Sequence, residues 1–173
     1  MTTIPEFPQF KSVQLQDHDF IKEVLRKYGP QTSEWSFTNL FIWQSHYGFQ
    51  WAMYRDWLIV VGRGQEDATY ALQPMGPPSR VEVTRILLEW LWEEKGELSA
   101  RVERADQRIV SEIEGKKDFL VEPARDQFDY VYRSEDLIRL AGRKYHAKRN
   151  HINKFRRSHT FTYVPFADKY LRA

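Results

Sequence analysis

Residues 49–62, FQWAMYRDWLIVVG, consist of two apolar and aromatic segments separated by the pair Arg55 and Asp56. Two strand-forming segments with a two-residue spacer are typical of a β-hairpin. The spacer lacks the Asn-Gly sequence that such turns favour, but its length still predicts a hairpin. TYALQP, at 69–74, predicts a third strand. The centre of the fold is therefore expected to be a sheet.

Helical patterns lie on both sides of this hairpin in the sequence. DHDFIKEVLRKYG, at 17–29, repeats apolar residues at intervals of three and four, and a Gly-Pro pair ends the pattern. SEWSFTNLFIWQSHYG, at 33–48, predicts a second helix. VEVTRILLEWLWEEKG, at 81–96, carries an apolar stripe behind a capping-box pattern of Ser79 and Glu82. We expect one helix in each of these three segments.

Shorter strand and helix patterns alternate after this third helix. They are LSARVE at 98–103 (strand), DQRIVSEIEG at 106–115 (helix), DFLVE at 118–122 (strand) and DYVY at 129–132 (strand). Strands that alternate with helices in this order indicate an α/β layer. We therefore predict an α/β fold in which helices flank a mixed sheet.

The composition excludes several classes of protein. The chain has 173 residues, of which 42% are hydrophobic and 15% aromatic, enough for one globular core. The absence of Cys excludes disulfides, thiolate metal sites and Cys nucleophiles. There is no apolar run of about 18 residues, and the N-terminal residues do not resemble a signal peptide. We expect a soluble, cytoplasmic protein.

The net charge of +2 hides an asymmetry along the chain. Residues 1–133 hold 16 Lys or Arg and 21 Asp or Glu, a net charge of −5, whereas residues 134–173 hold 10 and 3, a net charge of +7. Such a basic segment suits an anionic partner, namely nucleic acid, nucleotide or phospholipid headgroup, or it docks on the acidic body of the protein. Charge alone does not choose between these partners.

The basic character is concentrated in GRKYHAKRNHINKFRRSH, residues 142–159, which has seven Lys or Arg, three His and no acidic residue. On a helical wheel one side gathers Ala141, Tyr145, Ile152 and Phe155, and we expect this side to be buried. The opposite side presents only cations and amides: Arg143, His146, Asn150, Asn153, Lys154 and Arg157.

Three further cations lie on or near the apolar side of this helix. Arg149 and Arg156 fall on one border of it. Lys148 falls inside it, where an unpaired ammonium group would cost several kcal/mol, so we expect Lys148 to pair with a carboxylate or to extend outward. Asp129 is the candidate partner.

Three interpretations of the basic helix remain open: a solvated face, a surface that binds a polyanion, or part of a catalytic site. A helix selected only for solubility usually interleaves Glu with Lys. No acidic residue occurs from Leu137 to Ala167, so the cations repel one another unless anions neutralise them. This pattern favours a functional surface.

The segment FDYVYRSEDLIRLAGRKYHAKRNHINKF, residues 128–155, closely resembles the hallmark segment of bacterial proteins similar to the C-terminal domain of phosphatidylglycerol lysyltransferase. The aromatic segment at 33–48 also resembles the N-terminal part of that family. The resemblance extends over the whole chain. It implies two tandem folds of the GNAT type, the acyl-CoA N-acyltransferase fold, and relatives that transfer an aminoacyl group from aminoacyl-tRNA to a lipid or peptidoglycan precursor.

The resemblance also implies a division of the chain. Residues 1–133 would form the first GNAT-like domain, and residues 134–173 would supply the basic helix and first strand, TFTYVPFADKYLRA at 160–173, of an incomplete second one. The resemblance implies an anion-binding or substrate-binding surface at this junction, formed by Lys148, Arg149, Asn150 and His146. The helical wheel adds Arg143, Asn153 and Arg157 to these candidates.

Other chemical motifs are weaker. Gly62 and Gly64 in VVGRGQED lack the following helix that a pyrophosphate-binding turn requires, so we interpret the segment as a simple loop. In QDHDF the consecutive residues Asp17, His18 and Asp19 cannot easily converge on one metal ion, and we interpret them as helix-capping residues. We predict no metal site, and no catalytic residue can be assigned.

These observations support two functions of different classes. The first is membership of a two-domain aminoacyl- or acyl-transferase family, with the present residues inactive by themselves and with acyl-CoA or aminoacyl-tRNA as the cosubstrate of the full family protein. The second is a non-catalytic module that uses the basic helix to bind RNA, such as tRNA, or an anionic lipid headgroup. In both cases the exposed start of the second domain predicts self-association.

Overall fold

The structure is a computed structural model that describes residues 3–165 and residue 167. The chain divides into two compact units, and the boundary falls between Asp129 and Tyr130. Each unit is described by itself below.

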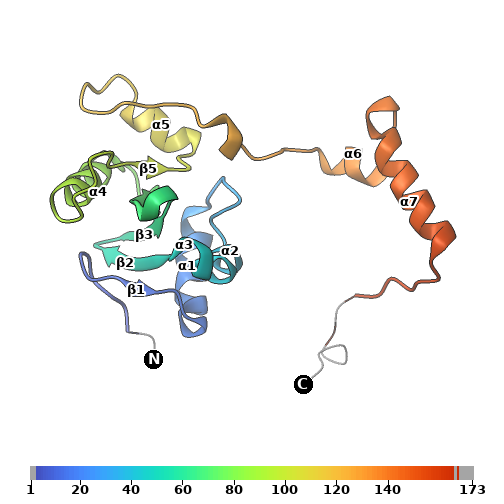
Figure 1. Ribbon diagram of the computed structural model, residues 1–173, viewed down its shortest axis with the longest axis horizontal. Helices are drawn as coiled ribbons and strands as arrows, with labels where there is room; N and C mark the ends of the chain where they lie inside the picture. Colours follow the sequence, from blue (N-terminus) through green and yellow to red (C-terminus); the bar gives the residue numbers. More distant parts are fainter. Residues whose placement is uncertain (1–2, 166, 168–173) are drawn as a thin grey trace. The chain divides into compact units, whose positions relative to one another are not determined.

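The first unit contains a five-stranded sheet in the order β1-β2-β3-β4-β5 (Figure 1). The strands are β1 (Lys11–Ser12), β2 (Gln50–Tyr54), β3 (Trp57–Arg63), β4 (Thr69–Leu72) and β5 (Val102–Glu103). The first three pairings are antiparallel and the pairing of β4 with β5 is parallel. The predicted mixed sheet is therefore confirmed.

The predicted hairpin forms the middle of this sheet. Tyr54 pairs with Trp57, which leaves Arg55 and Asp56 as the two turn residues. Arg55 adopts φ 53°, the left-handed conformation that a tight hairpin turn requires. The hairpin forms despite the unfavourable turn sequence, and all five residues of β2 pair with β3.

Helices precede and follow the hairpin, as predicted. The α-helices of this unit are α1 (His18–Tyr28), α2 (Phe37–Ile42), α3 (Gln44–Tyr47), α4 (Val81–Glu93) and α5 (Gln107–Ile113). Single 3₁₀ turns are η1 (Leu15–Asp17), η2 (Gln65–Asp67) and η3 (Arg125–Gln127).

Two details of the predicted helices are wrong. The segment 33–48 forms two short helices, α2 and α3, because the helix is interrupted at Trp43 before it resumes. The capping box of Ser79 and Glu82 does not form, since Arg80 occupies the N-cap position of α4. The Ser79 hydroxyl lies 3.4 Å from the backbone nitrogen of Val81 instead.

Alternate residues of β3 and β4 face two separate apolar cores. Leu58 and Val60 belong to the core beneath α1 and α2, together with Trp51 of β2. Ile59 and Val61 belong to the core beneath α4. Side chains of a strand alternate between the two faces of its sheet, so a central strand that is apolar throughout needs helices on both faces.

A buried carboxylate connects the start of α1 with the sheet. Asp17 is fully buried and accepts hydrogen bonds from Lys11 Nζ (2.8 Å), Trp51 Nε1 (2.9 Å) and the backbone N–H of Gln14 (3.0 Å). Its side chain makes no capping bond to α1, so the helix-capping interpretation is wrong for that helix. The carboxylate caps the 3₁₀ turn η1 through Gln14 instead.

The second unit consists of the helices α6 (Ser134–Arg139) and α7 (His146–Ser158), joined by the 3₁₀ turn η4 (Arg143–Tyr145). Leu140 ends α6 with φ 48°, and Gly142 follows with φ 82°. The predicted basic helix is thus present as α7. Among the described residues, no helix is both long and apolar enough to cross a membrane.

Three predicted strands are absent from the described part of the chain. Residues 118–122, 129–132 and 160–164 form neither strand nor helix, and residues 166 and 168–173 of the last segment lie outside the described residues. The LSARVE strand is reduced to β5. A strand needs a partner for its backbone groups, and these segments lack one: Leu120 is 85% exposed and Val131 is 91% exposed.

The Asp17 carboxylate gives the first testable prediction. Asp17→Ala leaves the indole N–H of Trp51 and the ammonium group of Lys11 without their acceptor, so we expect the free energy of unfolding to fall by about 2–3 kcal/mol. Asp19→Ala, at a fully exposed side chain two residues away, should cost less than about 1 kcal/mol. Urea unfolding of both variants measures the difference, and equal losses would show that the buried carboxylate has no special role.

Candidate functional site

The predicted polar side of the basic helix is exposed. We define the polar side of α7 as Arg143, His146, Asn150, Asn153, Lys154 and Arg157, all of which are exposed. Asn150 Nδ2 lies 3.4 Å from His146 Nδ1, one helical turn away. Among the described residues, no carboxylate forms an ion pair with Arg143, Lys154 or Arg157. These cations are therefore free to meet an external anion.

A shallow hollow marks the start of α7. It is lined by Arg143, Lys144, His146 and Ala147. The first backbone N–H groups of a helix lack partners within the helix and carry a partial positive charge. The unpaired Arg143, a histidine and a helix N-terminus thus occupy one small area, an arrangement that suits a phosphate or carboxylate group, whereas Lys144 pairs with Asp136.

Lys144 lines this hollow but was not among the predicted site residues. Its Nζ donates to Asp136 Oδ2 at 2.8 Å. This hydrogen bond is the main cause that raises the pKa of Lys144 and lowers the pKa of Asp136. The helical wheel assigned Lys144 to neither the polar nor the apolar side, so it was not selected.

Arg149 has a contact inside the second unit that the sequence pattern did not predict. Its guanidinium group donates to the carbonyl oxygens of Leu140 and Gly142, the latter at 2.8 Å. Both carbonyls lie where the chain turns from α6 toward α7. One Arg bridging two carbonyl oxygens stabilises a turn whose own carbonyls lack helical partners. In this unit Arg149 therefore connects α6 with α7.

Asp129, the expected partner of Lys148, is engaged by hydrogen bonds inside the first unit. The Asp129 carboxylate accepts hydrogen bonds from the backbone N–H of Ser33 (2.9 Å) and from its hydroxyl (2.6 Å). Lys148 is exposed, and its Nζ lies 5.8 Å from the centre of the Tyr132 ring. The alternative expectation, an extended Lys148, is the one that the structure shows.

The apolar side of α7 is not buried as expected. Of its predicted members only Tyr145 is buried, at 5% exposure, and it lies in η4 just before the helix. Ile152 is 40% exposed, Phe155 is 48% exposed and Ala141 is exposed as well. Two helices provide too little surface to cover this side within the second unit.

Packing explains one of the two glycines of VVGRGQED. A Cβ atom on Gly62 would lie 2.9 Å from the Phe49 ring, which is too close for a side chain, so this glycine is explained without a bound phosphate. A Cβ atom on Gly64 would lie 2.9 Å from Arg101 Nη2, the end of a flexible side chain that can move aside. The interpretation of this segment as a simple loop agrees with this geometry.

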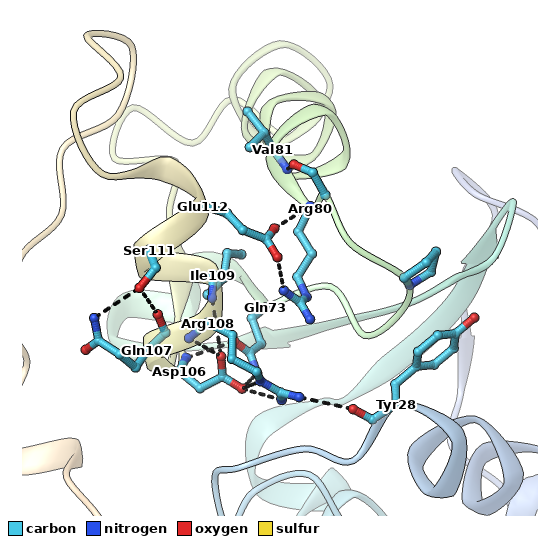
Figure 2. A network of polar contacts seen from close by, with 12 residues as sticks. Tyr28, Gln73, Arg80, Val81, Asp106, Gln107, Arg108, Ile109, Ser111 and Glu112 are labelled. Atoms are coloured by element: carbon cyan, nitrogen blue, oxygen red, sulfur yellow. Dashed lines mark hydrogen bonds and ion pairs between the residues drawn. The ribbon is translucent and has the colours of Figure 1, made fainter.

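The N-terminus of α4 meets an internal carboxylate. Glu112 of α5 accepts a hydrogen bond from the backbone N–H of Arg80 at 2.6 Å and pairs with the Arg80 guanidinium group (Figure 2). Arg80 is buried. A carboxylate of the chain itself therefore occupies the position at which a helix N-terminus would otherwise receive an external anion.

A second buried carboxylate lies close by in Figure 2, at the start of α5. Asp106 accepts hydrogen bonds from Gln73 Nε2 (3.1 Å) and from Arg108, and Arg108 also donates to the Tyr28 carbonyl oxygen (3.1 Å). Burial by itself raises the pKa of Asp106, but the bonds from Arg108 and Gln73 outweigh it and lower the pKa. The network joins β4, α5 and the end of α1.

Comparisons with known proteins find a matching family and a similar solved structure. The family described as phosphatidylglycerol lysyltransferase, C-terminal, matches residues 25–171. The chain is also similar to the crystal structure of a conserved protein of unknown function from Bacteroides thetaiotaomicron VPI-5482, with 30% sequence identity and a TM-score of 0.70. That match covers 86% of this chain and 50% of the solved chain, so the present chain spans half the length of that relative. No curated protein matches.

The contacts of Arg149 give the second prediction. Arg149→Ala removes both bonds to the turn carbonyls, so we expect the opening free energy of the amides in η4 and the first turn of α7 to fall by about 1–2 kcal/mol. Arg157→Ala, on the polar side of the same helix, should leave these amides unchanged. Hydrogen exchange of the two variants measures the effect, and similar exchange in both would remove the structural role of Arg149.

Proposed function

This chain belongs to the phosphatidylglycerol lysyltransferase C-terminal family, and we propose that it supplies the first fold and a phosphate-binding helix of a two-domain aminoacyl- or acyl-transferase. The proposed ligand of the polar side of α7 is the phosphate backbone of tRNA, the aminoacyl donor that this family resemblance implies. The single observation that carries the proposal is the set of exposed, unpaired cations on that side.

Charge and geometry support a polyanion over a solvated face. Arg143, Lys154 and Arg157 are exposed without a carboxylate partner among the described residues, and no acidic residue occurs from Leu137 to Ala167. Asn150 and Asn153 add amide donors between the cations. Lys, Arg and Asn side chains are the usual donors to phosphate oxygens.

The polar side of α7 offers only cations, amides and one imidazole to its ligand, and this composition suits phosphate groups. Ile152 and Phe155 are exposed on the other side of the helix, and a helix at a lipid interface would bury such residues among the acyl chains. We choose RNA because the family resemblance implies an aminoacyl-tRNA donor. An anionic lipid headgroup shares the phosphate chemistry, and it forms the second arm of the experiment below.

The first unit supports a role in positioning more than one in cosubstrate binding. The N-terminus of α4 faces the Glu112 carboxylate, which would repel a pyrophosphate group and already accepts the N–H of Arg80. Gly62 of β3 is required by packing against Phe49. We therefore assign acyl transfer to the complete two-domain protein.

The non-catalytic alternative uses the same surface. In that case the chain binds RNA by itself and no transfer step follows in any longer form. Binding of RNA by itself does not distinguish the two functions. Acyl or aminoacyl transfer by a protein with both GNAT-like domains would distinguish them.

The third prediction is the salt dependence of tRNA binding. Each phosphate that a cation neutralises releases counterions, so the affinity should fall steeply as salt rises. The triple variant Arg143→Ala, Asn150→Ala, Arg157→Ala should bind more weakly and reduce the slope of log K against log salt by about two, one for each lost cation. Fluorescence anisotropy with labelled tRNA, across a series of salt concentrations, measures both effects.

The controls of this experiment separate the alternatives. A matched variant, Arg26→Ala and Arg85→Ala in the first unit, removes two cations elsewhere and should leave the slope unchanged. Phosphatidylglycerol vesicles replace tRNA in the second arm, with phosphatidylcholine vesicles as the neutral control. Salt-independent binding, or a triple variant equal to the wild type, would return α7 to the role of a solvated helix.

The fourth prediction concerns turnover. We expect the purified 173-residue chain to transfer no acyl group from acetyl-CoA and no aminoacyl group from lysyl-tRNA to phosphatidylglycerol, because the Glu112 carboxylate already occupies the N-terminus of α4 that could receive a pyrophosphate group. Radiolabel transfer assays measure this directly. Turnover above the background of a heat-denatured sample would contradict the assignment of catalysis to the two-domain protein.

A further inference from the structure

The outward side of α4 carries an exposed tryptophan next to unpaired carboxylates. Trp92 is 57% exposed, although Trp is among the most costly side chains to leave in water. Two exposed carboxylates lie close to Trp92 in the sequence: Glu89 is about one helical turn before it, and Glu93 is the next residue. Neither carboxylate forms an ion pair with another described residue. This acidic surface, defined by Trp92, Glu89 and Glu93, has no role in the functions considered so far.

The apolar side of α7 has the complementary composition. Ile152 and Phe155 are exposed there. On the helical wheel two exposed cations, Lys148 and Arg156, lie next to them, each four residues from Ile152. We call Lys148, Ile152, Phe155 and Arg156 the docking side of α7. It is distinct from the polar side, because the two sets share no residue.

We propose that the docking side of α7 packs on the acidic surface of α4 in a second copy of this chain, and that two such contacts form a reciprocal dimer. Ile152 and Phe155 cover Trp92, while Lys148 and Arg156 pair with Glu89 and Glu93. The polar side of α7 stays open, so the dimer is compatible with phosphate binding and does not depend on it.

Three observations favour a second copy as the occupant. The charges are opposite, since residues 1–133 carry −5 and residues 134–173 carry +7. Both helices have 13 residues, so each offers a length of about 20 Å to the other. Each copy holds one acidic surface and one docking side, so two copies supply the partners for two such contacts.

Charge reversal gives a decisive test. Variant A carries Glu89→Lys and Glu93→Lys, and variant B carries Lys148→Glu and Arg156→Glu. Within each variant, the surface of α4 and the docking side of α7 carry charges of the same sign. Each variant by itself should therefore sediment as a monomer at concentrations at which the wild type is a dimer. An equimolar mixture should form a heterodimer, because α7 of A meets the acidic α4 of B and α7 of B meets the basic α4 of A.

A matched control excludes a general effect of net charge. Lys154→Glu with Arg157→Glu changes the charge of α7 by the same amount on the polar side, and this variant should remain a dimer. Trp92→Ala should weaken the wild-type dimer by about tenfold or more, as expected for the loss of an aromatic anchor. All substitutions are at exposed positions, and circular dichroism checks that each variant is folded.

Each possible result either supports or contradicts the proposed dimer. Monomeric A and B that pair only with each other support the proposal. A wild-type monomer at tens of micromolar, a working concentration for modest interfaces of this kind, overturns it. So does a mixture of A and B that stays monomeric, because a contact within one chain or with another protein cannot be restored by mixing.

Discussion

The first unit depends on the requirement to cover both faces of β3. Leu58 and Val60 point to one core while Ile59 and Val61 point to the other, so the strand is stable only with helices on both faces of the sheet. Helices α1 and α2 precede the hairpin and cover one face, and α4 follows β4 and covers the other. The parallel pairing of β5 results from this crossover, since α4 returns the chain to the sheet in the same direction.

The second unit follows a different rule, because charge rather than burial organises it. Arg149 is used internally to hold the turn between α6 and α7, and Lys144 pairs with Asp136. The remaining cations face outward on two sides of one helix, one purely polar and one mixed with Ile152 and Phe155. A single basic helix can thus meet a phosphate ligand and an acidic protein surface at once.

Patterns of local origin were predicted well from the sequence. The hairpin at 49–62, the helix with Gly29 at its end, and the helix that starts after Asp106 each follow from turn length, period or cap. The strands expected at 118–122 and 129–132 were wrong, because alternation indicates a strand only if another strand pairs with it. The buried bonds of Asp17 and the partner of Asp129 were missed, since both join residues far apart in the sequence, where no spacing rule applies.

The central claim is that the polar side of α7 binds phosphate groups, and the three asparagines of the chain allow a direct test. Asn150 and Asn153 lie on that side, whereas Asn39 donates to the Ser33 carbonyl in the first unit. With ¹⁵N-asparagine labelling, titration with tRNA should shift the side-chain amide signals of Asn150 and Asn153 and leave those of Asn39 in place. Unchanged signals of Asn150 and Asn153 at saturating tRNA, or a shift of Asn39 alone, would contradict the account.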